Sequence, residues 1–420
     1  MPEPEVAAAE VVESLWKHGD FLRLWAAQTT SAAGDQFTGL AIPLIAVLTL
    51  HATAGQMGIL TAVGRAPFLL VSLFAGVWVD RLPRRPILVV ADLGRALILL
   101  SIPLAAFVGV MNMPQLYAVA LLVGLLSVFF DISYQAILPA LVSGKQLMEG
   151  NSRLEATRSV ASLAGPSMAG FVIQFLSAPV AIILDSLSFF VSAGIIGTIR
   201  RREPHREAPG RQPMLAAVRE GLAVVFGNRL LASIAACTGT VNFSFAAVIS
   251  LYILFATRDL GLSPSKIGLI FSVGNVSGLV GALTAGRLGA RLGIGRIIVA
   301  SGFLIGAGWL PLVFATPRTA FSMLVLAGSI SSFSIPVYNI NQVSLRQAIT
   351  PHRLQGRMNA TMRFLVMGTM PLGGLVGGAL GDVLPLRQAI AIAAAGGMVG
   401  FLWVLLSPVR SLRAIPESIE

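Results

Sequence analysis

Charged residues are scarce in this sequence. Asp, Glu, Lys and Arg make up 12% of its 420 residues, whereas hydrophobic residues make up 55%. Ordinary soluble domains carry about 25% charged residues. The composition therefore excludes such a domain and indicates a protein that lies in a lipid bilayer.

Cysteine and histidine are also rare. The single cysteine, Cys237, lies inside an apolar run, so a disulfide framework is excluded and a buried thiol is expected. The four histidines fall in expected tails or loops: His18, His51, His205 and His352. There is no HExxH, GxSxG or phosphate-cradling GxxxxGKS/T motif. We expect no enzyme, no metal site and no cofactor, and the missing ATP site makes a proton gradient the expected energy source.

Long apolar runs fill most of the chain. A membrane-spanning helix needs about 20 apolar residues, and the sequence offers twelve such runs, at residues 22–50, 55–79, 87–110, 114–140, 154–176, 180–199, 229–256, 265–290, 296–315, 320–347, 358–382 and 388–407. These predict an all-α membrane protein with little chain outside the bilayer.

The arginines predict the orientation. The net charge of +11 is concentrated in alternate loops and the carboxyl-terminal tail: Arg81, Arg84, Arg85, Arg200, Arg201, Arg202, Arg206, Arg211, Arg410 and Arg413. The intervening loops near His51, Asn112 and Ala178 carry almost no Lys or Arg. The positive-inside rule then places both termini of a multi-pass plasma-membrane protein in the cytoplasm. The basic charge reflects topology, so no nucleic-acid partner is expected. The acidic start of the chain lacks the pattern of a signal peptide and should remain as a tail.

The two halves of the sequence repeat each other. Residues 58–82, GILTAVGRAPFLLVSLFAGVWVDRL, align with residues 268–292, GLIFSVGNVSGLVGALTAGRLGARL, so that Gly58 pairs with Gly268 and Arg81 with Arg291. Two homologous six-span bundles are typical of a transporter with its substrate site near the midplane. The expected division is a tail (1–20), an amino-terminal bundle (21–199), a linker (200–227), a carboxyl-terminal bundle (228–407) and a second tail (408–420).

A charged hairpin, GVWVDRLPRRP, follows the second span. Its pattern, Gly76-x-x-x-Asp80-Arg81-x-x-Arg84-Arg85, resembles the loop signature of the major facilitator superfamily, although Pro83 stands in place of a glycine. A carboxylate at a helix end can pair with loop arginines and a neighbouring helix N-terminus. We expect a cytoplasmic latch between the halves. Positive-inside charge alone explains the arginines but not Asp80 or the glycine.

Further charged residues are candidates for the same cytoplasmic gate. Asp92 and Arg95 stand one turn apart at the start of the third span, where they either neutralise each other or join the latch. Glu155, Arg158 and Arg363 fall near the cytoplasmic ends of spans 5 and 11 and are expected at an inner gate.

Four charges fall at bilayer depth, where an unpaired charge is costly. Asp35 and Arg65 lie about halfway along spans 1 and 2 and could pair. Asp131 lies in the inner half of span 4, and Asp185 near the outer end of span 6, where packing or capping is expected. A carboxylate exposed alternately to the two sides can load and release a proton. Asp35 is the first candidate carrier and Asp131 the second, and a permanent ion pair of Asp35 with Arg65 is the alternative.

The fifth span carries SLAGPSMAG. Gly165-Pro166-x-x-x-Gly170 resembles the antiporter signature of the drug-efflux branch, with Ala169 in place of one glycine. Small residues allow close helix approach and a proline bends the helix, so a plain packing face would look similar. The resemblance implies export.

A wider resemblance covers residues 20–407. FLRLWAAQTTSAAGDQFTGLAIPL, RLEATRSVASLAGP and LDSLSFFVSA are similar to the enterobactin-exporter and macrolide-efflux branch of the superfamily. This implies a monomeric proton antiporter that exports a small amphiphilic drug, antibiotic or siderophore; the alternative is an importer or symporter of a small metabolite. Candidate substrate-binding residues are polar and lie in apolar spans: Asn242, Asn275, Tyr338, Asn339 and Gln342. Each could instead make an interhelical hydrogen bond.

Overall fold

The computed structural model describes residues 15–71, 78–79, 82–142, 144–200 and 214–414. Within these residues the chain is helical and contains no strand, so the predicted all-α fold is confirmed. Taken with their short continuations, ten of the described helices are long and apolar enough to cross a membrane. Large apolar side chains such as Phe107 and Val383 are exposed along the bundle, as a lipid-facing surface requires.

The amino-terminal half contains six helical rods. They are α1 (Gly19–Leu44) with η2 (Ile45–Thr49), α2 (Ala54–Leu70), α4 (Arg84–Val108), α5 (Met113–Leu141), α6 (Gly144–Phe175) and α7 (Ala178–Gly197). A short η1 (Leu15–Lys17) precedes them. The rods α2 and α6 are not among the ten candidate spans: α2 has only 17 described residues, and α6 is rich in Ser, Gly and charged residues.

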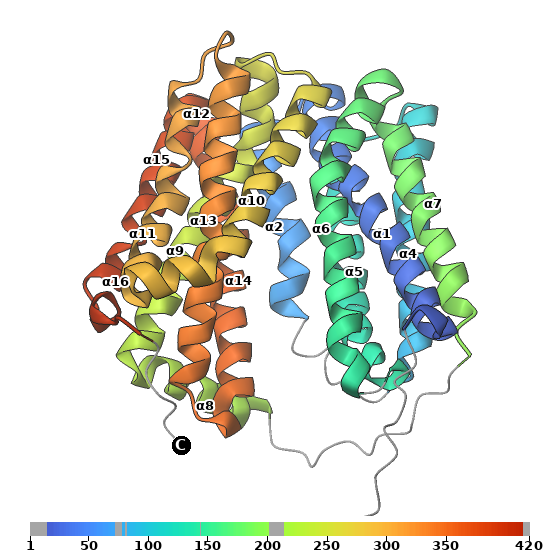
Figure 1. Cartoon of the computed structure of the whole chain (residues 1–420). Helices are drawn as coiled ribbons and strands as arrows, with labels where there is room; N and C mark the ends of the chain where they lie inside the picture. Colours follow the sequence, from blue (N-terminus) through green and yellow to red (C-terminus); the bar gives the residue numbers. More distant parts are fainter. Residues whose placement is uncertain (1–14, 72–77, 80–81, 143, 201–213, 415–420) are drawn as a thin grey trace, which may run out of the picture.

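The carboxyl-terminal half repeats this arrangement (Figure 1). Its rods are α9 (Arg229–Leu254) with η3 (Phe255–Asp259), α10 (Pro264–Leu292), α11 (Ile294–Ala307) with α12 (Leu310–Phe314), α13 (Ala320–Ala348), α14 (His352–Val383) and α15 (Leu386–Val399) with α16 (Leu402–Leu405). The chain continues into η4 (Pro408–Ser411). One helix was not predicted: α8 (Met214–Gly227) forms within the expected linker and packs on α14 and α9.

The two ends of the molecule differ. We call the end where α2 and α10 begin the closed end, and the opposite end the α8 end (Figure 1). At the closed end, one apolar core combines buried residues of both halves, from Leu40 in α1 to Ala394 in α15. Towards the α8 end the core divides into separate clusters that each belong to one half, the two larger ones around Leu138 and around Met358. The halves are therefore packed together at the closed end and separately at the α8 end.

A buried ion pair fixes three helices of the amino-terminal half. Asp92 and Arg95, both in α4, are 0% and 3% exposed and form an ion pair. Ser192 of α7 donates a hydrogen bond of 2.6 Å to the second oxygen of Asp92. The Arg95 guanidinium lies 4.4 Å from the ring centre of Phe130 in α5 and 4.1 Å from that of Phe189 in α7. This placement favours mutual neutralisation over a role in a surface latch.

We predict that Asp92→Asn lowers the free energy of unfolding by about 3–5 kcal/mol, because it leaves the Arg95 charge buried without its partner. The double variant Asp92→Asn/Arg95→Met should recover much of this loss. Chemical unfolding of the purified protein, followed by circular dichroism, measures both. A single variant as stable as the parent chain would contradict the structural role of the pair.

Candidate functional site

Two helix crossings join the halves at the closed end, and one of them contains the antiporter-like motif. A Cβ atom at Gly268 in α10 would lie 3.2 Å from the Cα of Gly170 in α6 and would collide with the Pro166 carbonyl oxygen. Close by, the Ser167 hydroxyl donates to the Ser272 hydroxyl over 2.7 Å. The small residues of the motif therefore bring the α6 backbone against the other half.

The second crossing joins α2 and α14 and is related to the first by the sequence repeat. A Cβ atom at Gly58 would lie 2.5 Å from the Gly374 carbonyl oxygen and 2.8 Å from the Cα of Gly378. The Gly55 amide donates a hydrogen bond of 2.9 Å to Asp382. Gly58 and Gly268 are equivalent positions in the repeat, so each half supplies one glycine of the same kind to the contact.

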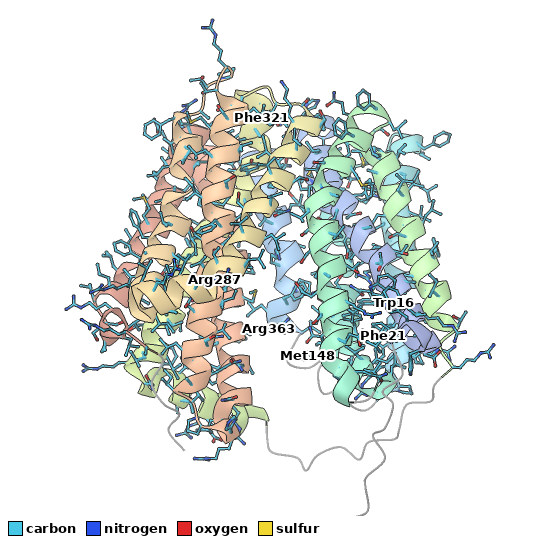
Figure 2. All side chains as sticks on the ribbon, in the orientation of Figure 1. Trp16, Phe21, Met148, Arg287, Phe321 and Arg363 are labelled. Carbon is cyan, nitrogen blue, oxygen red and sulfur yellow. The ribbon has the colours of Figure 1, made fainter. Side chains whose placement is uncertain are left out.

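Three of the predicted gate charges lie at the α8 end without an ion-pair partner among the described residues. Glu155 and Arg158 of α6 and Arg363 of α14 are exposed, and among the described residues none of them forms an ion pair or hydrogen bond. Figure 2 shows Met148 and Arg363 at this end, on different halves. The Arg363 charge nevertheless acts on Asp131 across the halves, as do Arg158 and Arg95 within the amino-terminal half.

The predicted proton carriers lie in the amino-terminal half. Asp35 is exposed although it lies near the middle of the rod formed by α1 and η2. The charges of Arg95, Asp131, Asp92 and Arg158 all act on it. Asp131 of α5 is half-buried. Among the described residues, no group of three or more His, Cys, Asp or Glu is suited to hold a metal ion.

The suggested pair of Asp35 and Arg65 is not formed in this structure. Arg65 is exposed on α2, and α2 packs mainly on α14, α5 and α9, not on α1. Neither side chain has an ion-pair partner among the described residues. The pair was suggested because both residues lie about halfway along their spans. This similar depth does not reveal which helices are neighbours.

Asp185 is more central than its sequence position suggested. It is 0% exposed in α7, and a Cβ atom at Gly34, the residue before Asp35, would collide with its carboxylate. The Ser188 hydroxyl donates to one Asp185 oxygen over 3.2 Å, and the Thr38 hydroxyl of α1 also interacts with this carboxylate. The small Gly34 before Asp35 was the one sequence signal of a close helix contact here.

Most of the candidate substrate residues are occupied in packing. The Tyr338 side chain is buried, and its hydroxyl shares a hydrogen bond of 2.8 Å with Thr238. Gln342 is also buried. Asn242 donates to the Val366 carbonyl over 3.5 Å, and Asn275 donates to the Ser162 carbonyl of the other half over 2.6 Å.

These placements favour interhelical hydrogen bonds for Tyr338, Asn242 and Asn275, whereas the hydrogen bond of Gln342 stays within α13. Asn339 is the exposed member of the set, although its side-chain oxygen accepts a hydrogen bond of 3.5 Å from Gln342.

The hairpin signature is described only in part. Gly76, Asp80 and Arg81 lie outside the described residues. Arg84 is buried at the start of α4, and the Arg85 guanidinium donates to the Gly197 carbonyl at the end of α7. Arg85 therefore ties two helices of the same half, and the latch between halves stays a prediction.

Two repeat-related six-helix halves, joined by repeat-related crossings, define a membrane transporter of the major facilitator superfamily rather than an enzyme. The family model described as "Transmembrane secretion effector" matches residues 14–418, and the chain belongs to this family.

Similar proteins include efflux pumps. The chain is 26% identical over 412 residues to a multidrug efflux pump, Tap, of Mycolicibacterium fortuitum, covering 94% of this chain and 98% of that protein. It is 23% identical over 367 residues to macrolide efflux protein A of Streptococcus pyogenes, covering 86% and 89%. In fold it resembles a bacterial homologue of the iron transporter ferroportin, with a TM-score of 0.71, 16% identity, and coverage of 94% and 99%.

We predict that Gly268→Val prevents the closed end from sealing, because the added side chain has no space against the Pro166 carbonyl. Transport should fall about 5- to 150-fold, the range that corresponds to the about 1–3 kcal/mol cost of overpacking. Gly194→Val is the matched control, since a Cβ atom at Gly194 meets nothing within 4 Å. Flux through both variants in proteoliposomes provides the measurement. Equal flux would show that the glycine contact is dispensable.

Proposed function

We propose that this transporter exports a small amphiphilic molecule by alternating access, in exchange for protons. The observation that carries the proposal is the exposed Asp35 carboxylate in mid-membrane, with the buried Asp185 and the half-buried Asp131 close to it. The similarity to multidrug and macrolide efflux proteins supports the direction of transport and the chemical class of the substrate.

The arrangement of the halves supports loading from the cytoplasm. The halves are packed separately at the α8 end, which adjoins the arginine-rich linker. The positive-inside rule assigns such a segment to the cytoplasm. We infer that the protein lies in the plasma membrane with both termini in the cytoplasm. This conformation then receives substrate from the cytoplasm. The monomer is the proposed working unit, and substrate and bilayer are its only proposed partners.

The coupling follows from the cost of enclosing Asp35. Rocking the halves together at the α8 end removes water from around Asp35, and an ionised carboxylate without water or partner is costly in the membrane. Removal of water is the largest contribution to this cost. The charges of Arg95 and Arg158 attract the ionised carboxylate, whereas those of Asp131 and Asp92 repel it. Either a proton or a bound substrate that covers the carboxylate removes this cost. A protein with no substrate and an ionised Asp35 therefore changes conformation slowly. It changes conformation readily with bound substrate on the way out or with a bound proton on the way back, and this requirement couples export to proton entry.

Asp131 is the second site of the proposed proton path. It faces Arg158 and Arg363, which belong to different halves. A change in the separation of the halves therefore changes the charge around Asp131 directly. Asp185, enclosed beside Asp35 and electrostatically linked to it, offers a further carboxylate that can hold a proton.

We predict that Asp35→Asn abolishes concentrative transport but leaves downhill flux, because the amide mimics a permanently protonated carboxyl. The measurement uses proteoliposomes with erythromycin or ethidium as probe, with and without an imposed pH gradient. Asp259→Asn, which alters an exposed carboxylate at the end of η3, is the control. An Asp35→Asn variant that still concentrates either probe would move the proton site to Asp131.

A further inference from the structure

We propose that the carboxyl-terminal half binds the phosphate group of an anionic phospholipid in a pocket lined by Arg291, Arg296, Arg410 and Arg413. We call this cavity of about 460 Å³ the arginine pocket. It lies where α10 ends and α11 begins, against η4. The proposed function does not use it.

The arginine pocket has a fixed backbone frame. The Gly295 amide donates to the Leu412 carbonyl over 2.9 Å, and the Ile294 amide donates to the Arg413 carbonyl over 3.4 Å. A Cβ atom at Gly295 would collide with the Val409 carbonyl, and Gly293 has a φ of 91°, a conformation that favours glycine. These contacts hold the tail that carries Arg410 and Arg413 against the turn that carries Arg291 and Arg296.

The charge of the arginine pocket is not compensated by the described residues. All four arginines are exposed, no acidic residue lines the pocket, and no side chain among the four forms a hydrogen bond or ion pair with another described residue. Four like charges around one cavity repel one another. A phosphate group relieves this repulsion and matches the paired donors of guanidinium groups.

The equivalent position in the other half is different. A cavity of about 570 Å³ is lined there by Arg23, Arg85 and Arg200. Arg200 follows the last helix of its half, α7, as Arg410 follows α15 and α16 in the other half. Here Asp20 accepts from Arg23 over 2.7 Å and from the Arg200 amide over 3.2 Å, and Arg85 donates to the Gly197 carbonyl. The side chains of Arg23 and Arg85 thus have protein partners, and Asp20 is an acidic residue beside them, whereas no acidic residue lines the arginine pocket.

The surroundings point to a lipid as the source of the phosphate. Leu292, which lines the pocket, is 52% exposed, and in the segment leading to Arg410, Trp403 is 55% and Leu406 77% exposed. A tryptophan at the end of a spanning helix is typical of the membrane interface. An anionic phospholipid fits both the arginines and the exposed apolar residues. Basic pockets at the membrane interface attract its headgroup, and its acyl chains cover the apolar side chains.

The test compares spin-labelled phosphatidylglycerol with spin-labelled phosphatidylcholine, for the full chain in phosphatidylcholine nanodiscs. We expect the protein to immobilise phosphatidylglycerol preferentially. Arg410→Gln/Arg413→Gln should weaken this preference about 30-fold, the effect of removing two interfacial charges. Arg291→Gln/Arg296→Gln provides a second variant if the first does not fold. The control, Arg229→Gln/Arg353→Gln, removes two exposed arginines elsewhere at the α8 end and should keep the preference.

Several results would overturn the proposal. One is an unchanged preference in the pocket variants, and another is an equal loss in the control. Displacement of the lipid by soluble glycerol phosphate would identify a site for free anions. If Glu417→Gln/Glu420→Gln raised the preference as strongly as the pocket variants lower it, the tail carboxylates that follow Arg413 in the sequence would be the natural occupants. All these readouts are independent of transport, so failure of the proposed export would not affect them.

Discussion

The direct contact of helix backbones at the closed end is the constraint on which the rest of the structure depends. Gly268 meets Pro166 and Gly170, and Gly58 meets Gly374 at the equivalent position. Hydrophobic attraction between helices is weak in lipid, so close packing of small residues is what holds the halves together. The two crossings lie at the end of the molecule where both halves share one apolar core. At the opposite end, each half packs around a core of its own. Such a geometry allows the halves to rock about the crossings without unpacking either bundle.

In the proposed transport cycle, two kinds of intramembrane charge have different roles. Asp92 and Arg95 are buried, paired and braced by Ser192, so they keep the amino-terminal half rigid. Asp35 is exposed and has no ion-pair partner among the described residues, so its charge state responds to whatever enters the space beside it. Rigid halves are needed for this response to have a large effect, because a soft bundle would rearrange locally around a protonated carboxyl instead of transmitting the change.

The sequence predicted the helices well because apolar length and arginine placement act locally along the chain. The alignment of Gly58 with Gly268 indicated the repeat, whereas the contact of both glycines with the opposite half emerges only from the structure. Contacts between helices were harder to predict. The Asp35 and Arg65 pairing was wrong for this structure because equal depth does not make two helices neighbours. Tyr338 looked like a lining residue, but which face of α13 is buried depends on its packing against α10 and α11. The helix α8 and the enclosure of Asp185 likewise depend on tertiary packing.

The most direct test of rocking about the glycine crossings is a pair of distance measurements in one protein population. Spin labels in a Cys237→Ser background at Met148 and His352 report the α8 end, and labels at Val110 and Arg318 report the closed end. Double electron–electron resonance at alkaline and acidic pH, with and without erythromycin, should show the first distance shortening as the second lengthens. A closed-end distance that stays constant while the α8-end distance changes, or two distances that change in the same direction, would contradict rigid-body rocking.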